Sequence, residues 1–208
     1  MIQTGDGPVV YVVDDDASFL RGLGRRLRAS GFQVREFDSA EAFLKQRRAG
    51  EPGCAIVDLH MPALDGLGLQ DHLSARHDAL PLVFLTGGGD VRTSVHAMKR
   101  GAIDFLTKPV IGEELVAAVT AALKRDEEQR HALRENLDAR EKWTRLTPRQ
   151  REVCELVVQG RLNKQIAAEL GMTERTVKAH RAEIMHRMGV SSVPDLVRVI
   201  GRRSWRRG

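Results

Sequence analysis

The chain has 208 residues, of which 42% are hydrophobic, and carries a formal net charge of +5 at pH 7. This length is ample for two domains with separate cores. No apolar stretch approaches the roughly 20 residues of a membrane span, which argues against an integral membrane protein. Residues 1–7 lack the basic region and apolar core of a secretion signal. Cys54 and Cys154 lie in apolar contexts and at no zinc-binding spacing, as expected for free thiols in a cytoplasmic protein.

The charge is divided unevenly along the chain. Residues 1–140 contain 18 Lys or Arg against 21 Asp or Glu, whereas residues 141–208 contain 15 against 7. The first part is therefore slightly acidic and the last third strongly basic. A basic region of this kind is typical of a nucleic-acid binder, although a solvated basic surface would give the same composition.

The first predicted strand, residues 8–13, is an apolar run that ends in three carboxylates, Asp14, Asp15 and Asp16. Such a run is typical of a buried parallel strand. Carboxylates crowded at a strand end repel one another, and oxygen ligands suit a hard divalent cation such as Mg²⁺. The alternative is that the triplet only begins a helix, because Asp favours N-caps.

The rest of the first 123 residues alternates between strands and helices. Further strands are predicted at 33–37, 54–58, 82–86 and 103–107, and helices at 17–30, 39–49, 66–76, 90–100 and 111–123. Helix ends are expected at Gly31 and Gly101, and N-caps at Ser39 and Asp90. This alternation predicts an α/β domain with a doubly wound, five-stranded parallel sheet.

Polar residues stand where three of the later strands end. Asp58 ends the third strand, Thr86 ends the fourth, and Lys108 follows the fifth. Parallel strands would bring these ends together beside Asp14 and Asp15. A carboxylate nucleophile, a cation site, a hydroxyl and an ammonium group form a set that suits transfer of a phosphoryl group onto Asp58.

Residues 124–142 are rich in charge and lack Gly and Pro, which predicts an exposed helical linker. Apolar residues spaced by three or four positions, among them Leu115, Leu133 and Leu137, leave a two-stranded coiled coil open as the alternative.

Residues 146–200 are predicted to form an all-helical domain. Thr147-Pro148 begins a helix that runs to Gln159, and Asn163 is expected to cap the short helix that follows. After a turn at Gly171, Thr173 caps a helix over 174–188, and a last helix is expected near 194–200. Two helices joined by a Gly-containing turn form a helix-turn-helix unit.

The residues Asp14, Asp15, Asp58, Thr86, Phe105 and Lys108-Pro109 resemble, in this order, the receiver domain of two-component response regulators. The segments 163–167 and 176–180 resemble the LuxR/NarL-type DNA-binding domain, and the pairing looks like the FixJ subgroup. The resemblance implies strand order 2-1-3-4-5 in a receiver domain at 8–123, a helical linker at 124–142 and a helix-turn-helix domain at 143–208.

The resemblance also implies how the first domain works. Asp15, Asp58 and the backbone carbonyl of His60 would hold Mg²⁺, with Asp14 acting through water. Asp58 would take a phosphoryl group from a partner sensor histidine kinase or a small phosphodonor. Thr86 and Phe105 would then switch, and the protein would form a homodimer through Val91, Val95, Met98 and Ile103, hereafter the dimer face.

The second domain would then bind double-stranded DNA and control transcription in the cytoplasm, with RNA polymerase as a possible further partner. Its DNA contacts would be Lys164, Thr173, Arg175, Thr176, Lys178, Ala179, His180, Arg181 and Ala182.

Two other functions remain open. One is a helix-turn-helix regulator whose receiver works without phosphorylation. The other is a dehalogenase-like phosphohydrolase, which the sequence disfavours because Asp58-Leu59-His60 lacks the second acid of that family's Asp-x-Asp motif. We therefore expect a regulator and not an enzyme.

Overall fold

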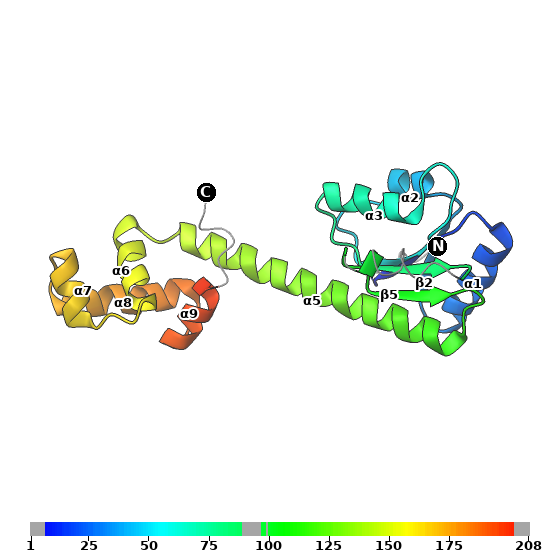
Figure 1. Ribbon diagram of the computed structural model, residues 1–208. Helices are drawn as coiled ribbons and strands as arrows, with labels where there is room; N and C mark the ends of the chain where they lie inside the picture. The colour runs from blue at the N-terminus through cyan, green and yellow to red at the C-terminus, as the bar shows by residue number, and fades with distance from the viewer. Residues whose placement is uncertain (1–6, 89–96, 99, 202–208) are drawn as a thin grey trace, which may run out of the picture. The chain divides into compact units, whose positions relative to one another are not determined.

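The structure is a computed structural model that describes residues 7–88, 97–98 and 100–201 (Figure 1). The chain forms two compact units, Met1–Arg130 and His131–Gly208. Most of the helix predicted at 90–100, with its expected cap Asp90, lies outside the described residues. Its end is described: Ala97 and Met98 are helical, and Gly101 follows with a φ of +93°, a conformation that favours glycine.

The first unit is built on a five-stranded parallel sheet in the order β2-β1-β3-β4-β5, as predicted. The strands are β1 (Val9–Val13), β2 (Gln33–Phe37), β3 (Gly53–Asp58), β4 (Leu82–Thr86) and β5 (Asp104–Thr107). Every residue of β3 and β4 is buried. Central strands of a parallel sheet are covered on both faces, which explains why they appear in the sequence as continuous apolar runs.

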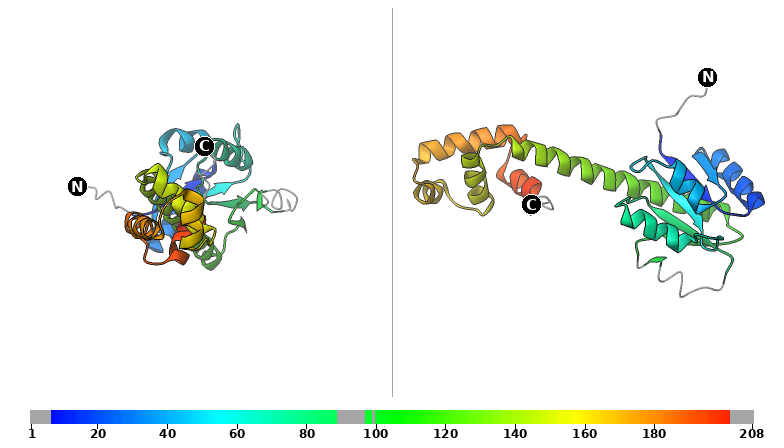
Figure 2. Two further views of the ribbon diagram at one scale, coloured as in Figure 1. Left: turned by 90° about the vertical axis from the view of Figure 1, so that its left-hand side faces the viewer. Right: turned by 90° about the horizontal axis from the view of Figure 1, so that it is seen from above.

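Helices cover both faces of this sheet (Figure 2). They are α1 (Ala17–Ala29), α2 (Ala40–Gln46), α3 (Gly66–Ala75) and α5 (Gly112–Thr144). Tyr11 and Val13 pack with α2 and α3, whereas Val10 and Val12 pack with α1 and α5. The doubly wound α/β fold is thus confirmed.

Helix α2 ends three residues earlier than predicted. Arg47 leaves the helix with an extended backbone (φ −75°, ψ 132°), and its guanidinium turns inward to pair with Asp78. It also lies 5.6 Å from the centre of the Tyr11 ring. Asp78 lies 31 residues further along the chain, so the local sequence carries no signal for this contact.

Helix α5 joins the fifth predicted helix to the predicted linker. Leu115 and Val119 are fully buried in the core of the first unit, whereas Leu133 and Leu137 are 60% and 56% exposed. The apolar stripe considered for a coiled coil is therefore largely occupied by the protein's own core. The two leucines that remain exposed lie four residues apart and span less than one heptad, whereas a stable coiled coil requires an apolar seam over several heptads.

The prediction that the linker is exposed throughout is wrong at Asp126. Its side chain is buried, and Oδ2 accepts hydrogen bonds from the Gly53 backbone N–H (3.0 Å) and from Arg130 Nε (2.7 Å). Arg130 Nη2 also donates to the Gly50 carbonyl at 2.7 Å. The start of the predicted linker is thereby fastened to the first residue of β3.

The second unit is all-helical, as predicted, with α6 (Pro148–Val158), α7 (Asn163–Leu170), α8 (Glu174–Met188) and α9 (Val193–Gly201). Thr147 caps α6 through its hydroxyl, and the Thr147 backbone N–H donates to Gln150 Oε1 at 3.0 Å. Thr173 caps α8, and Gly171 ends α7 in the left-handed conformation. Together α7 and α8 form the predicted helix-turn-helix unit.

The predicted N-cap of α7 is wrong. The cap position is Leu162, whose N–H donates to Gln165 Oε1 at 2.8 Å, and Asn163 is the first residue inside the helix. Among the described residues, no helix is both long and apolar enough to cross a membrane. Both cysteines are buried, and burial raises the pKa of the Cys54 thiol to about 12.

Candidate functional site

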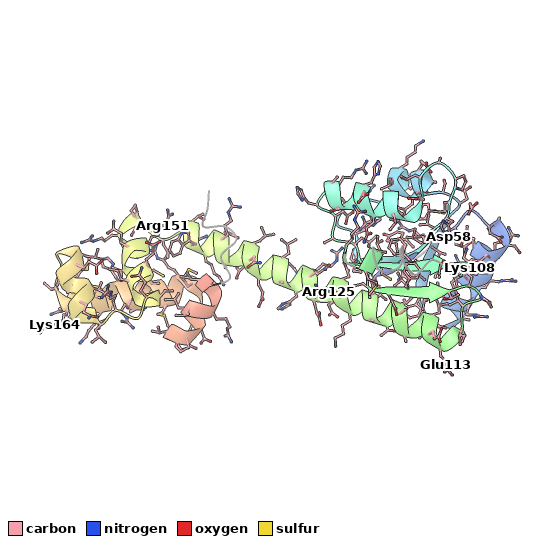
Figure 3. The ribbon with its side chains drawn as sticks, in the orientation of Figure 1. Asp58, Lys108, Glu113, Arg125, Arg151 and Lys164 are labelled. Atoms are coloured by element: carbon pink, nitrogen blue, oxygen red, sulfur yellow. The ribbon has the colours of Figure 1, made fainter. Side chains whose placement is uncertain are left out.

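The predicted polar residues meet at the carboxyl edge of the sheet. Asp14 directly follows β1, Asp58 ends β3, Thr86 ends β4 and Lys108 directly follows β5. The strands are in level register, because Val13 pairs with Val57 and Asp58 pairs with Leu85. Figure 3 shows Asp58 and Lys108 at this same end of the sheet.

Lys108 links the two buried carboxylates. Its Nζ lies 2.6 Å from Asp14 Oδ2 and 3.0 Å from Asp58 Oδ2. Burial raises the pKa of Asp14, against the effect of the Lys108 hydrogen bond. Burial alone would lower the pKa of Lys108, but its hydrogen bonds to both carboxylates and their charges outweigh burial and raise it. The ammonium therefore stays charged and holds the carboxylates side by side.

Phe19 is part of this site, although the sequence did not point to it. Lys108 Nζ lies 4.3 Å from the centre of the Phe19 ring, a distance typical of a cation–π contact. Phe19 stands in the first turn of α1, three residues after Asp16 at the end of the acidic triplet. This position in the sequence could have indicated that Phe19 belongs to the site, because the first turn of α1 lies next to the strand ends.

Three carboxylates form a possible cation site. Asp14, Asp15 and Asp58 each place one ligand atom within 4.8 Å of the others, and Asp15 is exposed. Asp16 does not belong to this cluster, because it caps α1 by accepting from the Ser18 and Phe19 N–H groups. The helix-start alternative is thus right for Asp16 alone. Hard oxygen donors around one small space are the ligand set of a hard divalent cation.

Two further residues border this cluster. His60 is exposed, and its backbone N–H lies 3.4 Å from Asp58 Oδ1; a ligand role for its carbonyl stays a prediction. Gly66 packs so closely that a Cβ atom there would lie 2.6 Å from the Asp58 carbonyl oxygen. Asp65 caps α3 by accepting from the Gly68 N–H at 2.7 Å. The Asp65-Gly66 turn therefore shapes the site without adding a carboxylate to it.

The predicted switch residues lie on adjacent strands. Thr86 is buried, and its hydroxyl accepts from the Gly88 N–H at 3.3 Å. Phe105 is half-buried, with its ring centre 5.9 Å from that of Phe84. In the register of β4 and β5, Thr86 pairs with Thr107 and Phe84 pairs with Phe105. The two switch residues are thus two positions apart on neighbouring strands, and a coupled change of the two stays a prediction.

The dimer face is described only in part. Val91 and Val95 lie outside the described residues. Met98 is 45% exposed, whereas Ile103 is half-buried and packs against the core beneath α1 and α5. Of the two described members, Met98 is the one with a large exposed surface.

In the second unit, α7 and α8 present most of the predicted DNA contacts on the surface. Lys164, Thr173, Arg175, Thr176, Lys178, Ala179 and Ala182 are exposed, and His180 and Arg181 are half-buried. Lys164, Lys178 and Arg181 line one pocket of ≈ 540 Å³ between the two helices. Figure 3 marks Lys164 at the start of α7.

Three of these side chains have partners within the unit. The Thr173 hydroxyl accepts from the Thr176 N–H at 3.1 Å and lies 2.8 Å from the Thr176 hydroxyl. Arg181 Nη1 donates to Asn163 Oδ1 at 2.8 Å. The sequence does not predict the contact between Asn163 and Arg181, because a polar residue at a helix start is more often a cap.

An acidic site on the carboxyl edge of a doubly wound sheet, followed by a helix-turn-helix unit, defines a regulator that binds DNA and is controlled through its first domain. Residues 10–120 match the response regulator receiver domain, and residues 144–200 match the luxR family of bacterial regulatory proteins. The chain belongs to the FixJ/NarL-type family of two-component response regulators.

Individual relatives agree with this assignment. The chain is 42% identical over 194 residues to the response regulator protein TodT of Pseudomonas putida, covering 93% of this chain and 86% of TodT. It is 37% identical over 190 residues to the transcriptional regulatory protein FixJ of Bradyrhizobium diazoefficiens, covering 91% and 93%. The protein is therefore a response regulator that controls transcription.

Solved structures agree as well. The response regulator StyR superposes with a TM-score of 0.81 at 42% identity, covering 94% of this chain and 99% of that one. Full-length FixJ of B. japonicum gives a TM-score of 0.59 at 37% identity, covering 94% and 96%.

Proposed function

We propose that Asp58 accepts a phosphoryl group from a phosphohistidine on a partner sensor histidine kinase, and that this controls DNA binding. The observation that carries the proposal is the Lys108 ammonium held between Asp14 and Asp58 beside the exposed Asp15. An Asp58 oxygen would bond to phosphorus as the bond from phosphorus to the donor nitrogen breaks. Lys108 would stabilise the charge on the phosphoryl oxygens.

Mg²⁺ is the proposed cofactor. Asp15, Asp58 and the His60 carbonyl would hold it directly, and Asp14 through water. The oxygen-only donor set supports this choice. When bound, the cation supplies positive charge that neutralises the carboxylates and the phosphoryl oxygens.

Asp15→Asn should weaken Mg²⁺ binding roughly 10-fold or more, by analogy with the loss of groups that support a metal site. The variant loses one negative charge of the cluster and keeps the shape of the side chain. Isothermal titration calorimetry measures the affinity. The matched control is Asp16→Asn, one residue further along, which keeps the α1 cap and should bind Mg²⁺ like the wild type. Equal affinities of the two variants would remove Asp15 from the site.

Incubation of the wild type with Mg²⁺ and acetyl phosphate, followed by intact mass measurement, tests the proposed function. A stable adduct of one phosphoryl group is the expected result. Rapid turnover of the phosphodonor without an adduct would favour the phosphohydrolase, contrary to the proposed non-enzymatic role. No adduct and no turnover would favour a receiver that works without phosphorylation.

Phosphorylation would next change the surface of the receiver. The Thr86 hydroxyl would leave Gly88 for the phosphate, Phe105 would follow, and two receivers would pair through the dimer face. Contact with RNA polymerase and a cytoplasmic location stay predictions.

Met98→Asp should prevent the increase in mass that light scattering detects after phosphodonor treatment, because it places a charge within the dimer face. Met98 is 45% exposed, so the change should leave the fold intact. Ile111→Asp is the control, since Ile111 is an apolar residue with 60% exposure outside the dimer face. A mass increase in the Met98 variant equal to that of the wild type would show that the contact lies elsewhere.

DNA binding would place the N-terminal half of α8 in the major groove. Lys178 is the proposed base contact, because a Lys ammonium can donate to guanine O6 and N7. Lys164, Arg175 and Arg181 would bind phosphates, which set the register and carry no sequence information. The same surface would be lined by the exposed side chains of Thr173, Thr176, Ala179 and Ala182 and by the half-buried imidazole of His180.

Lys178→Ala should lower the DNA-binding free energy by about 1–3 kcal/mol at one base position and relax specificity there. Arg175→Ala should instead weaken binding to all duplexes. It should also reduce, by about one, the salt slope, which is the slope of log affinity against log salt concentration. Fluorescence anisotropy on selected and random duplexes, over a salt series, separates the two effects. Arg198→Ala is the control, because Arg198 lies on α9 and pairs with Asp195. Unchanged binding by both α8 variants would mean that α8 does not read the DNA.

A further inference from the structure

A hydrogen bond between polar side chains joins the two helices of the helix-turn-helix unit. Asn163, the first residue of α7, accepts from Arg181 Nη1 on α8 at 2.8 Å across 18 residues of sequence. Both residues are half-buried. The Asn163 carboxamide is not used as a helix cap, because the cap position is Leu162 and Gln165 satisfies its N–H.

The partner of Arg181 is neutral, unlike the partners of several other arginines in this unit. Carboxylates pair with Arg145, Arg149, Arg187 and Arg198. An ion pair offsets the charge of an arginine, whereas a carboxamide oxygen holds the guanidinium and leaves its charge in place. Arg181 is therefore fixed in position and remains cationic.

The held guanidinium faces a pocket that suits an anion. Lys164 and Lys178 line the same ≈ 540 Å³ pocket as Arg181, with Glu174 as the acidic residue at its wall. Asn163 uses only Nη1 of the guanidinium, and an Arg carries five N–H donors in a planar fork. Donors on the rest of the fork stay available for a phosphate oxygen.

We infer that Asn163 is a positioning residue for DNA binding: it holds Arg181 in the conformation that binds a backbone phosphate. This rests on the proposed DNA-binding role of α8. Ordering a long side chain before it binds removes part of the entropic cost of association. Loss of the hydrogen bond should therefore raise the Kd for DNA roughly 3- to 10-fold.

The test compares Kd values of full-length variants for a labelled random-sequence duplex over a salt series, by fluorescence anisotropy. Asn163→Ala should raise Kd and keep the wild-type salt slope, because Arg181 keeps its charge. Arg181→Ala should raise Kd and lower the slope by about one. Asn163→Asp should also lower the slope, because a carboxylate would neutralise Arg181. In the Arg181→Ala background, Asn163→Ala should have no further effect.

Each other outcome has a definite meaning. If Asn163→Ala binds as tightly as the wild type, or more tightly, the hydrogen bond does not prepare Arg181 for DNA and the inference is overturned. It is also overturned if Asn163→Ala weakens binding equally in the Arg181→Ala background, since that result indicates damage to the fold. If the wild type binds no duplex, the proposed DNA-binding role of α8 fails first and the inference falls with it.

Discussion

Asp58→Asn protein should take up no phosphoryl group from acetyl phosphate and Mg²⁺, whereas the wild type takes up one. Asp14 is fully buried, and its two oxygens are occupied by the Asp16 N–H (2.9 Å) and by Lys108 Nζ. Asp58 retains some exposure, and its Oδ1 makes only a long contact of 3.4 Å with the His60 N–H. Of the two carboxylates beside Lys108, Asp58 is thus the less tightly held, and we expect it to attack the phosphoryl group. Asparagine keeps the shape of Asp58 and removes the nucleophilic oxygen.

Intact mass spectrometry after phosphodonor treatment measures this effect. The matched control is Asp65→Asn in the loop that follows β3. Asp65 caps α3, and Asn is an equally good N-cap, so this variant should be labelled like the wild type. An adduct on the Asp58→Asn protein, or a labelled peptide in the wild type that maps to Asp14, Asp15 or Asp65, would disprove the assignment.

Asp78→Ala should lower the free energy of unfolding of the first unit by about 3–5 kcal/mol, the usual cost of removing one partner from a buried ion pair. The side chains of Arg47 and Asp78 are only 3% and 7% exposed, and Arg47 Nη2 donates to Asp78 Oδ1 at 3.2 Å. Without Asp78, the guanidinium would remain buried above the Tyr11 ring with no counter-charge.

Hydrogen exchange of the β1 and β3 amides measures this loss, because these amides exchange through unfolding of the first unit and are independent of the second. Their exchange should accelerate by roughly two to four orders of magnitude, which is the same free energy expressed as a ratio. The control is Glu128→Ala, which removes an exposed pair with Arg125 at 3.9 Å and should change stability by less than about 1 kcal/mol. Equal exchange in the two variants would show that the buried pair contributes no more than an exposed one.

The sequence alone determined the fold and the polar residues that meet at the proposed phosphoacceptor site. Strands such as β3 and β4 are buried at every residue, so their apolar runs are visible without knowledge of their neighbours. In a parallel sheet, all carboxyl ends lie at one edge. The residues that end separate strands, Asp58 and Lys108 among them, could therefore be assigned to a single site from their positions in the chain. The caps at Thr147 and Thr173 were predictable for a similar reason, because a cap acts within three residues.

Only the tertiary structure decided how polar residues outside that pattern are used. Arg47 pairs with Asp78, Asp126 binds the Gly53 N–H, and Asn163 holds Arg181, across 31, 73 and 18 residues of sequence respectively. Each residue would be satisfied equally well by water on an exposed surface, so its type and local spacing do not reveal a distant partner. The same holds within the acidic triplet, where adjacent residues divide between the site and the α1 cap. Which carboxylate serves which role depends on where the chain turns after β1, and packing against the rest of the domain sets that turn.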